Sequence, residues 1–247
     1  MLNKAKLKLI RALSEKKFRN ETMLFVVEGE KSVVELLKSD FSVDSLLVTK
    51  YFYEKYKDLI HEEVLHFDII TDTEMKRVSA LQNNDTALGI AHQRGNHTLE
   101  IEKGEIAIAL DDVRDPGNLG TIMRIADWYG IKKIIASNET ADVWNSKTIG
   151  ASMGSFTRVE IFYTDLKRFL SSTKLPILGA FLDGENVHKF NFPTEGVLLM
   201  GNESLGIKKE LVDLVTKKVT IPKFGDTESL NVGVATAIIL DNWKRGK

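Results

Sequence analysis

Three segments of this chain share one construction, in which a short apolar run leads into a polar turn that contains glycine. The paired runs and turns are 106–110 with 115–120, 197–200 with 201–206, and 218–221 with 222–231. Ligands of parallel sheets bind at the carboxyl ends of the strands, so these turns are expected to line one pocket. Their backbone donors, one arginine, one carboxylate and small polar side chains suit a ligand with a polar sugar or a phosphate.

Apolar runs of four or five residues alternate with helical patterns along most of the chain, which predicts an α/β fold. In the first part, strands are expected at 24–27, 45–49, 64–70 and 87–91, and helices at 30–38, 54–60 and 73–81. In the second part, strands are expected at 106–110, 133–136, 158–162, 177–181, 197–200 and 218–221, with helices that include 119–128, 204–214 and 232–243. The second set predicts a mostly parallel sheet covered on both faces.

The stretch 93–98 is polar, rich in turn formers and without periodicity, so it is interpreted as a domain boundary. The predicted domains are residues 1–95 and 103–247. With 43% hydrophobic and 28% charged residues, the composition is that of an ordinary globular protein.

Several classes of site are disfavoured by what the sequence lacks. No apolar run approaches the roughly 18 residues that cross a bilayer, and residues 1–10 do not resemble a signal peptide. There is no cysteine, and the five histidines show no metal-ligand spacing. We therefore expect a cytoplasmic protein with no membrane partner and no metal.

The net charge is only −1, but the first twenty residues are strongly basic. They carry Lys4, Lys6, Lys8, Arg11, Lys16, Lys17 and Arg19 against Glu15 alone. Such a segment could grip a phosphate backbone. It could equally be a solvated amphipathic helix whose buried stripe is Leu2, Leu7, Leu9, Ile10 and Leu13. The segment by itself leaves both interpretations open.

The polar turns contain candidate chemical groups, each with a structural alternative. The chain has neither a dinucleotide-binding glycine motif nor a P-loop. Arg124 lies in a predicted helix beside the expected crevice, where it could hold a phosphate or form an ion pair with Asp127 or Asp111. Glu203 could accept hydrogen bonds or fix a cation in the pocket, or it could begin the predicted helix that follows it. Ser229 and Asn231 are good N-caps for the last helix, although one cap suffices.

Three segments then resemble a known family. They are Asn118-Leu119-Gly120-Thr121-Ile122-Met123-Arg124-Ile125-Ala126, then Leu199-Met200-Gly201-Asn202-Glu203-Ser204-Leu205-Gly206-Ile207, then Ile221-Pro222 with Ser229-Leu230-Asn231-Val232. In this order they resemble the motifs of the SpoU family, S-adenosylmethionine-dependent RNA 2′-O-ribose methyltransferases of the SPOUT superfamily. Residues 25–31 resemble the small L30e-like substrate-binding domain found in that family. The resemblance covers nearly the whole chain, and three motifs in order are highly specific.

The resemblance implies a fold, a cofactor and a set of site residues. The fold is a trefoil-knotted, mostly parallel SPOUT domain with a smaller N-terminal L30e-like α/β domain, in a homodimer whose active site lies at the interface. S-adenosylmethionine would be bound by Ala180, Phe181, Leu199, Gly201, Ile221 and Leu230. The catalytic set would be Asn118, Arg124, Glu203, Ser229 and Asn231. No metal is implied, because the sulfonium methyl group is already activated.

The departures from the family pattern are small. Thr121 stands where alanine is frequent, residues 127–129 replace a more apolar stretch, and Lys223 stands where methionine is usual. None of them removes a catalytic position. A guanidinium has a pKa above about 12, so our hypothesis is that Arg124 clamps the adjacent phosphate and stabilises the developing alkoxide.

The function predicted from the sequence is methylation of a ribose 2′-hydroxyl of RNA. The separate N-terminal domain favours ribosomal over transfer RNA, and the family favours phosphate binding by the basic segment. The predicted RNA contacts are Lys4, Lys8, Arg11, Lys16, Lys17 and Arg19. The alternatives are a transfer-RNA 2′-O-methyltransferase, a non-catalytic RNA-binding or assembly protein of the same fold, and a nucleotide-binding module with another cofactor. The complete catalytic set speaks against a non-catalytic protein.

Overall fold

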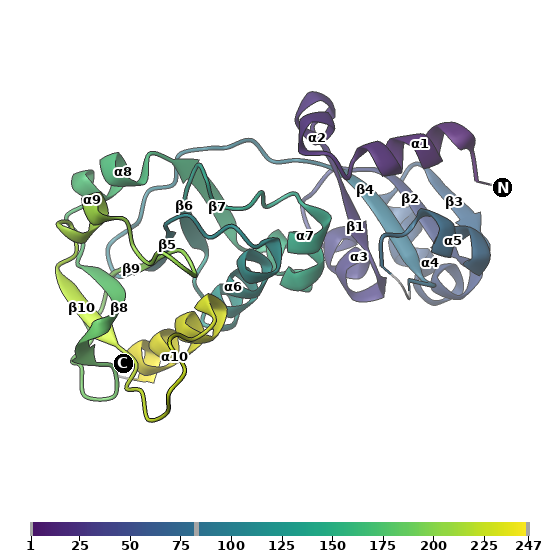
Figure 1. Cartoon of the computed structure of the whole chain (residues 1–247). Helices are drawn as coiled ribbons and strands as arrows, with labels where there is room; N and C mark the ends of the chain where they lie inside the picture. Colours follow the sequence, from purple (N-terminus) through teal and green to yellow (C-terminus); the bar gives the residue numbers. More distant parts are fainter. Residues whose placement is uncertain (1, 82–83, 246–247) are drawn as a thin grey trace. The chain divides into compact units, whose positions relative to one another are not determined.

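The computed structural model describes residues 2–81 and 84–245. The chain forms two compact units, and Figure 1 shows the elements of each. Unit 1 comprises residues 1–95 and 142–157, and unit 2 comprises residues 96–141 and 158–247. The chain therefore enters unit 1 twice. No helix in the described part of the chain is both long and apolar enough to span a membrane.

Unit 1 is built on a four-stranded sheet in the order β1-β4-β2-β3. Strand β4 is antiparallel to both of its neighbours, and β2 is parallel to β3. Its elements are α1 (Lys4–Ala12), α2 (Lys16–Thr22), β1 (Leu24–Glu28), α3 (Glu30–Leu37), β2 (Val43–Thr49), α4 (Lys50–Glu63), β3 (Phe67–Ile70), α5 (Asp72–Val78), β4 (Ala87–His92), α7 (Ser146–Ser152) and the 3₁₀ helix η1 (Ser155–Thr157). All four strands and three helices predicted for this part form, with boundaries shifted by a few residues.

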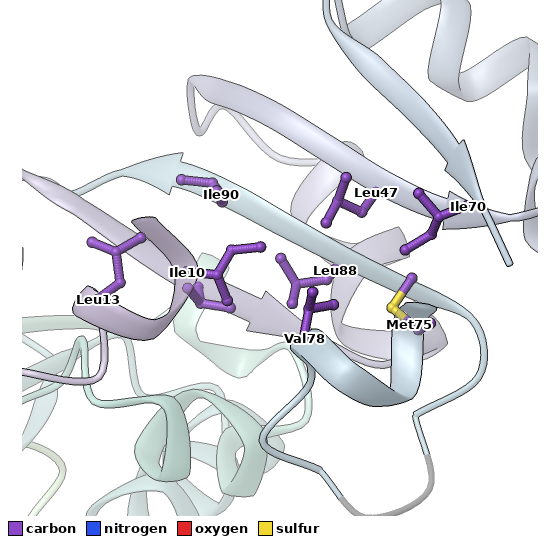
Figure 2. Packing of buried hydrophobic residues seen from close by; sticks show 9 residues of the cluster. Ile10, Leu13, Leu47, Ile70, Met75, Val78, Leu88 and Ile90 are labelled. Carbon is purple, nitrogen blue, oxygen red and sulfur yellow. The ribbon is translucent and has the colours of Figure 1, made fainter. Parts of the chain in front are cut away.

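Helices α1 and α5 contribute to the apolar core on one face of this sheet. Figure 2 shows side chains of both helices gathered against side chains of the strands. The buried members of this cluster are Ile10, Leu13, Val26, Leu47, Ile70, Met75, Val78, Leu88 and Ile90. Leu2, Leu7 and Leu9 pack against it, so the apolar stripe predicted for the basic segment is confirmed. One face of α1 therefore packs on the core. Lys4 and Lys8 are exposed, whereas Lys6 is half-buried and its Nζ lies 2.6 Å from Asp68 Oδ2 of β3.

Residues 142–157 are held in unit 1 by aromatic packing and one buried ion pair. The ring of the fully buried Phe25 lies 4.6 Å from that of Trp144 and 5.9 Å from that of Phe156. Arg19 is only 2% exposed, and its Nη2 lies 2.6 Å from Asp142 Oδ2. These contacts join residues more than one hundred positions apart, so the local sequence pattern carries no sign of them.

Unit 2 contains a six-stranded sheet in the order β10-β8-β9-β5-β6-β7, in which every neighbouring pair is parallel. Its elements are β5 (Ile106–Leu110), α6 (Pro116–Trp128), β6 (Lys133–Ser137), β7 (Glu160–Thr164), α8 (Leu166–Ser172), β8 (Ile177–Asn186), β9 (Gly196–Met200), α9 (Lys209–Val212), β10 (Lys217–Thr220) and α10 (Val232–Arg245). Figure 1 shows α8 and α9 on one side of this sheet and the packed pair α6 and α10 on the other. The predicted α/β class with a mostly parallel sheet is confirmed, and the trefoil knot stays a prediction.

The helix predicted at 204–214 is wrong in its first half, because only Lys209–Val212 is helical. Asn202 and Gly206 exchange two backbone hydrogen bonds of 3.0 Å, which closes a tight turn. The Asn202 side chain also accepts from the backbone N–H groups of Ser204 and Leu205. Gly206 adopts a φ of +69°, which L side chains rarely adopt. An asparagine-capped turn thus replaces the first helical turns.

We expect the Asp142→Asn substitution to destabilise unit 1 by about 3 kcal/mol, because it leaves the buried Arg19 charge without a countercharge. Urea denaturation followed by circular dichroism measures the free energy of unfolding. The control is Lys17→Ala, since Lys17 forms an exposed, 3.9 Å pair with Glu21 and should contribute little. Equal stability of the two variants would contradict this account of how residues 142–157 are held.

Candidate active site

A cavity of about 990 Å³ lies in unit 2 at the carboxyl ends of adjacent strands. Its walls come from four stretches of chain, namely residues 180–183, residues 200–207, residues drawn from 219–230, and Val232, Ala235 and Ile239 of α10. Two of the three polar turns predicted from the sequence therefore line it directly. The third turn, 115–120, reaches it through hydrogen bonds of Asn118.

A chain of side-chain hydrogen bonds joins all three turns. Asn118 Nδ2 donates to Glu203 Oε1 at 2.9 Å, and Asn231 Nδ2 donates to Asn118 Oδ1 at 2.8 Å. Asn231 Oδ1 in turn accepts from the backbone N–H of Gly233 at 2.9 Å and of Val234 at 3.3 Å. Because a carboxylate only accepts, Glu203 orients the Asn118 amide, and Asn118 orients Asn231. Asn231 thus caps α10 and belongs to the site.

The first turn of α6 presents Asn118 to this chain. Asp115 is the N-cap, and its side chain accepts from the backbone N–H of Asn118 at 2.8 Å. Pro116 follows at the start of the helix, where its missing N–H costs nothing. The cap fixes the Asn118 backbone and leaves its side-chain amide to bridge the other two turns.

The turn that carries Glu203 is anchored to the end of β5 by two successive aspartates. The backbone N–H of Lys208 donates to Asp111 Oδ2 at 2.7 Å, and Asn202 Nδ2 donates to the Asp112 carbonyl at 2.8 Å. Asp112 has a φ of +60°, a conformation in which aspartate is among the few tolerated side chains. Neither aspartate was predicted to build the site, although two acidic residues directly after an apolar strand are a visible signal in the sequence.

Burial raises the pKa of the Asp111 carboxyl above its usual value, although the Lys208 amide and ammonium oppose the shift. The Lys208 Nζ lies 3.5 Å from Asp111 Oδ1. The fully buried Asp111 carboxylate therefore anchors the 201–208 segment through the Lys208 amide, and it does not pair with Arg124.

Glycine is required at position 201 by close backbone approach. A Cβ built there would lie 2.3 Å from the Gly206 carbonyl carbon and 2.4 Å from the Ile207 nitrogen. Both neighbours are backbone atoms and cannot rotate away, so the turn would have to open. By contrast, Gly225 lines the same cavity and has open space where its Cβ would be.

Arg124 is exposed on α6 and forms no hydrogen bond or ion pair with any residue that the structure describes. Neither predicted structural partner is engaged with it. Asp127 pairs with Arg158 at 2.9 Å, and Asp111 lies beside Lys208. The guanidinium therefore remains available to a ligand.

The other predicted site residues fall into two groups. Ala180, Phe181, Gly201, Glu203, Ile221, Ser229 and Leu230 line the cavity. Leu199 does not line it, because it is fully buried in the cluster that α8 and α9 form on the sheet. Successive strand side chains point to opposite faces, and Leu199 points to the covered one. The prediction that it contacts the cofactor is corrected accordingly.

The basic residues of α1 and α2 are also divided. Lys4, Lys8, Arg11, Lys16 and Lys17 are exposed. Arg19 is buried, where it binds Asp142 and donates to the carbonyls of Leu13 and Ser14. The prediction that Arg19 contacts RNA is corrected, since its guanidinium is buried and bound to other residues of unit 1. Across the part of the chain that the structure describes, no cluster of three or more potential metal-ligating side chains is present.

Two protein families have models that match this chain. The model of the SpoU rRNA methylase family matches residues 105–241, and that of the MRM3-like substrate binding domain matches residues 4–89. The chain belongs to the SpoU family. The first match spans all three turns and the whole hydrogen-bond chain, so the resemblance read from the sequence is confirmed.

Individual proteins are similar over almost the whole chain. The 23S rRNA (guanosine(2553)-2′-O)-methyltransferase RlmP of Bacillus subtilis is 29% identical over 239 residues, which are 95% of this chain and 94% of that protein. The crystal structure of an AdoMet-bound rRNA methyltransferase from Sinorhizobium meliloti is 31% identical, with a TM-score of 0.87 over 99% of this chain and 96% of that one. A TrmH-family RNA methyltransferase structure from Porphyromonas gingivalis, described as putative, is 31% identical, with a TM-score of 0.86 over 100% of both chains.

The raised pKa of Asp111 has a consequence for stability. The folded chain holds the Asp111 proton more tightly than the unfolded chain, so this contribution to stability is present below the unfolded pKa and is lost as pH rises through the folded pKa. Asp111→Asn cannot titrate. The free energy of unfolding of the wild type minus that of the variant should therefore fall between about pH 3.5 and about pH 7. Urea denaturation at both values measures it, and an unchanged difference would contradict the shift.

Proposed function

We propose that this SpoU family member is an enzyme that transfers a methyl group from S-adenosylmethionine to a ribose 2′-hydroxyl of RNA, with ribosomal RNA as its substrate. The observation that carries the proposal is the hydrogen-bond chain Glu203–Asn118–Asn231 at a cavity lined by two of the family motifs. A protein that had lost catalysis would have no need to orient three side chains toward one another across distant turns.

The cavity suits S-adenosylmethionine by size and by charge. Its volume of about 990 Å³ lies at the upper end of the range for small-ligand sites, roughly 300–1,000 Å³. Among the described residues that line it, the charged ones are Asp183, Glu203, Lys223 and Glu228. Three of these four are acidic, which favours the cofactor's sulfonium and ammonium groups. Phe181 and Ile221 supply apolar surface for an adenine. When bound, the cofactor supplies an activated methyl group, which requires no metal.

The side chains of the site would act on the ribose. Arg124, which has no partner among the described residues, clamps the adjacent phosphate and stabilises the negative charge that develops on the 2′-oxygen. Glu203, Asn118 and Asn231 form a rigid hydrogen-bonded wall that aligns the hydroxyl, and Ser229 lies on the loop that leads into it. Alignment of two bound reactants can by itself lower a barrier by several kcal/mol.

Ribosomal RNA is favoured by the relatives that cover the whole chain. The Bacillus and Sinorhizobium proteins, both named for rRNA, span 95% and 99% of it. The tRNA (guanosine(18)-2′-O)-methyltransferase of Thermus thermophilus, 28% identical, spans only 60% of it. Residues 1–95 would form the L30e-like domain that binds RNA, with exposed Lys4, Lys8, Arg11, Lys16 and Lys17 against its phosphates, and residues 103–247 the methyltransferase domain. A transfer-RNA substrate is the alternative.

The proposal includes a cytoplasmic homodimer, a trefoil knot in the methyltransferase domain, and an active site at the two-fold interface. Support for self-association comes from exposed apolar side chains on the packed helices α6 and α10. Trp128 is 84% exposed on α6, and Val234 is half exposed on α10. Apolar residues left exposed on neighbouring helices often mark a protein interface.

The proposed function is tested by mapping 2′-O-methyl groups in ribosomal and transfer RNA from cells with and without this protein. One ribosomal nucleotide should lose its methyl group in the deletion strain and regain it when the purified protein and S-adenosylmethionine are added. A methyl group lost from transfer RNA instead would establish the alternative substrate. Unchanged methylation of both RNA classes would contradict the function.

Arg124→Lys should lower kcat by about 100-fold, because an ammonium cannot reproduce two parallel contacts to a phosphate. Methyl transfer to the mapped RNA at neutral pH measures it. Arg168→Lys is the matched control, since Arg168 is an exposed arginine of α8 on the other side of the sheet, and it should leave kcat unchanged. Near-normal turnover of Arg124→Lys would argue against a fork-shaped clamp.

Gly201→Ala should raise the Kd for S-adenosylmethionine more than tenfold, because the added Cβ forces the 201–206 backbone out of its tight turn. Gly225→Ala, in the same cavity, should stay within about twofold, since nothing lies within 4 Å of its Cβ position. Isothermal calorimetry on both folded variants measures the Kd. Similar affinities for the two variants would show that the Gly201 turn does not shape the cofactor site.

A further inference from the structure

The rim of the cavity carries large apolar side chains that are almost wholly exposed. Phe224 is 95% exposed, and Leu182 and Leu205 are each 81% exposed, yet all three line the same cavity. They come from three separate segments of the chain. Apolar side chains gathered at the mouth of a site, rather than scattered singly over a surface, indicate a ligand that covers them.

The cavity has an inner part and an outer part that differ in burial. Val219, Ile239 and Ile207 are buried, and they line its inner part. A small ligand in a protein site typically buries about 70–90% of its surface. Side chains as exposed as Phe224 cannot provide such burial, so the cofactor belongs in the inner part. The outer part is left for the second reactant.

The second reactant is a nucleotide of RNA, whose ribose and base can occupy different parts of the cavity. Its ribose must reach the wall formed by Glu203 and Asn118, and its base must then extend from the sugar toward the mouth. Proteins commonly hold unpaired RNA bases by stacking them on aromatic side chains. Phe224 is the one aromatic ring at the rim among the described residues that line the cavity, since Phe181 is half-buried.

The positive charge of Lys223 at the rim also suits an RNA nucleotide. Lys223 precedes Phe224, is exposed, and is the single basic side chain among the described lining residues. The acidic residues of the cavity would repel phosphate, so the backbone of the RNA must remain outside. Lys223 would meet a phosphate there.

We infer that Phe224 stacks on the base of the nucleotide whose ribose is methylated, and that Lys223 contacts the phosphate next to it. This inference rests on the proposed function and names how that site takes hold of its RNA. It makes Phe224 a substrate-binding residue. A flat aromatic ring accepts purine and pyrimidine faces alike, so it contributes affinity for an extruded base.

The test uses a synthetic RNA fragment around the mapped site, and the same fragment with an abasic ribonucleotide at the methylated position. The abasic fragment keeps the reacting 2′-hydroxyl and lacks only the base. On the normal fragment, Phe224→Ala and Phe224→Leu should both lower kcat/KM by roughly 10- to 100-fold, and Phe224→Trp should stay within about threefold. The Kd for S-adenosylmethionine should stay within twofold in all three. Arg168→Ala, at an exposed residue of α8 in unit 2, is the control.

On the abasic fragment, the wild type should fall to the level of Phe224→Ala, and the substitution should cost nothing further, because the base that it would contact is absent. Full additivity of the two changes would overturn the inference. An unchanged kcat/KM for Phe224→Ala, or a Kd for S-adenosylmethionine raised in parallel, would also overturn it. These outcomes differ from failure of the proposed function, in which the wild type methylates neither fragment.

Discussion

The site of this protein depends on one run of hydrogen bonds, from the Glu203 carboxylate through the Asn118 amide to the Asn231 amide and the first turn of α10. Each amide has both its donor and its acceptor engaged, so neither can rotate without breaking a bond. Asn118 and Asn231 lie 113 positions apart along the chain, and the three turns follow strands of one sheet. This run converts three locally flexible turns into a single rigid wall.

The side chains and backbone that support this wall are buried, and Asp112 adopts an unfavourable backbone conformation. Asp111 gives up solvation to receive the Lys208 amide, and Asp112 adopts a left-handed backbone that places its carbonyl beneath Asn202. Gly201 allows the returning backbone of Gly206 to approach within a distance that no side chain permits. These buried and strained positions cost folding free energy, and in return they hold the three turns in a fixed arrangement. Such local strain is common at functional sites.

The sequence pattern predicted the sheet and the convergence of turns because these follow from local rules. Apolar runs form buried strands, and parallel strands place their following loops at one edge. The pattern failed where contacts between distant residues overrode local preference. The residues at 204–208 have a helical pattern, but the Asn202 side chain and the Gly206 conformation hold them in a turn. Arg19 belongs to a basic run, but Asp142 draws it into the interior.

By itself, the sequence determined the fold class, the family and the identity of the polar groups on the three converging turns, since residue type and order carry that information directly. Only the tertiary structure decided which of those groups are free to act. Among the residues that it describes, it showed Arg124 without a hydrogen-bond or ion-pair partner and Arg19 paired with Asp142. It also showed Leu199 buried in the core and Phe224 exposed at the mouth of the cavity. Whether a side chain is free to contact a ligand depends on how it packs, and packing depends on residues that are far apart along the chain.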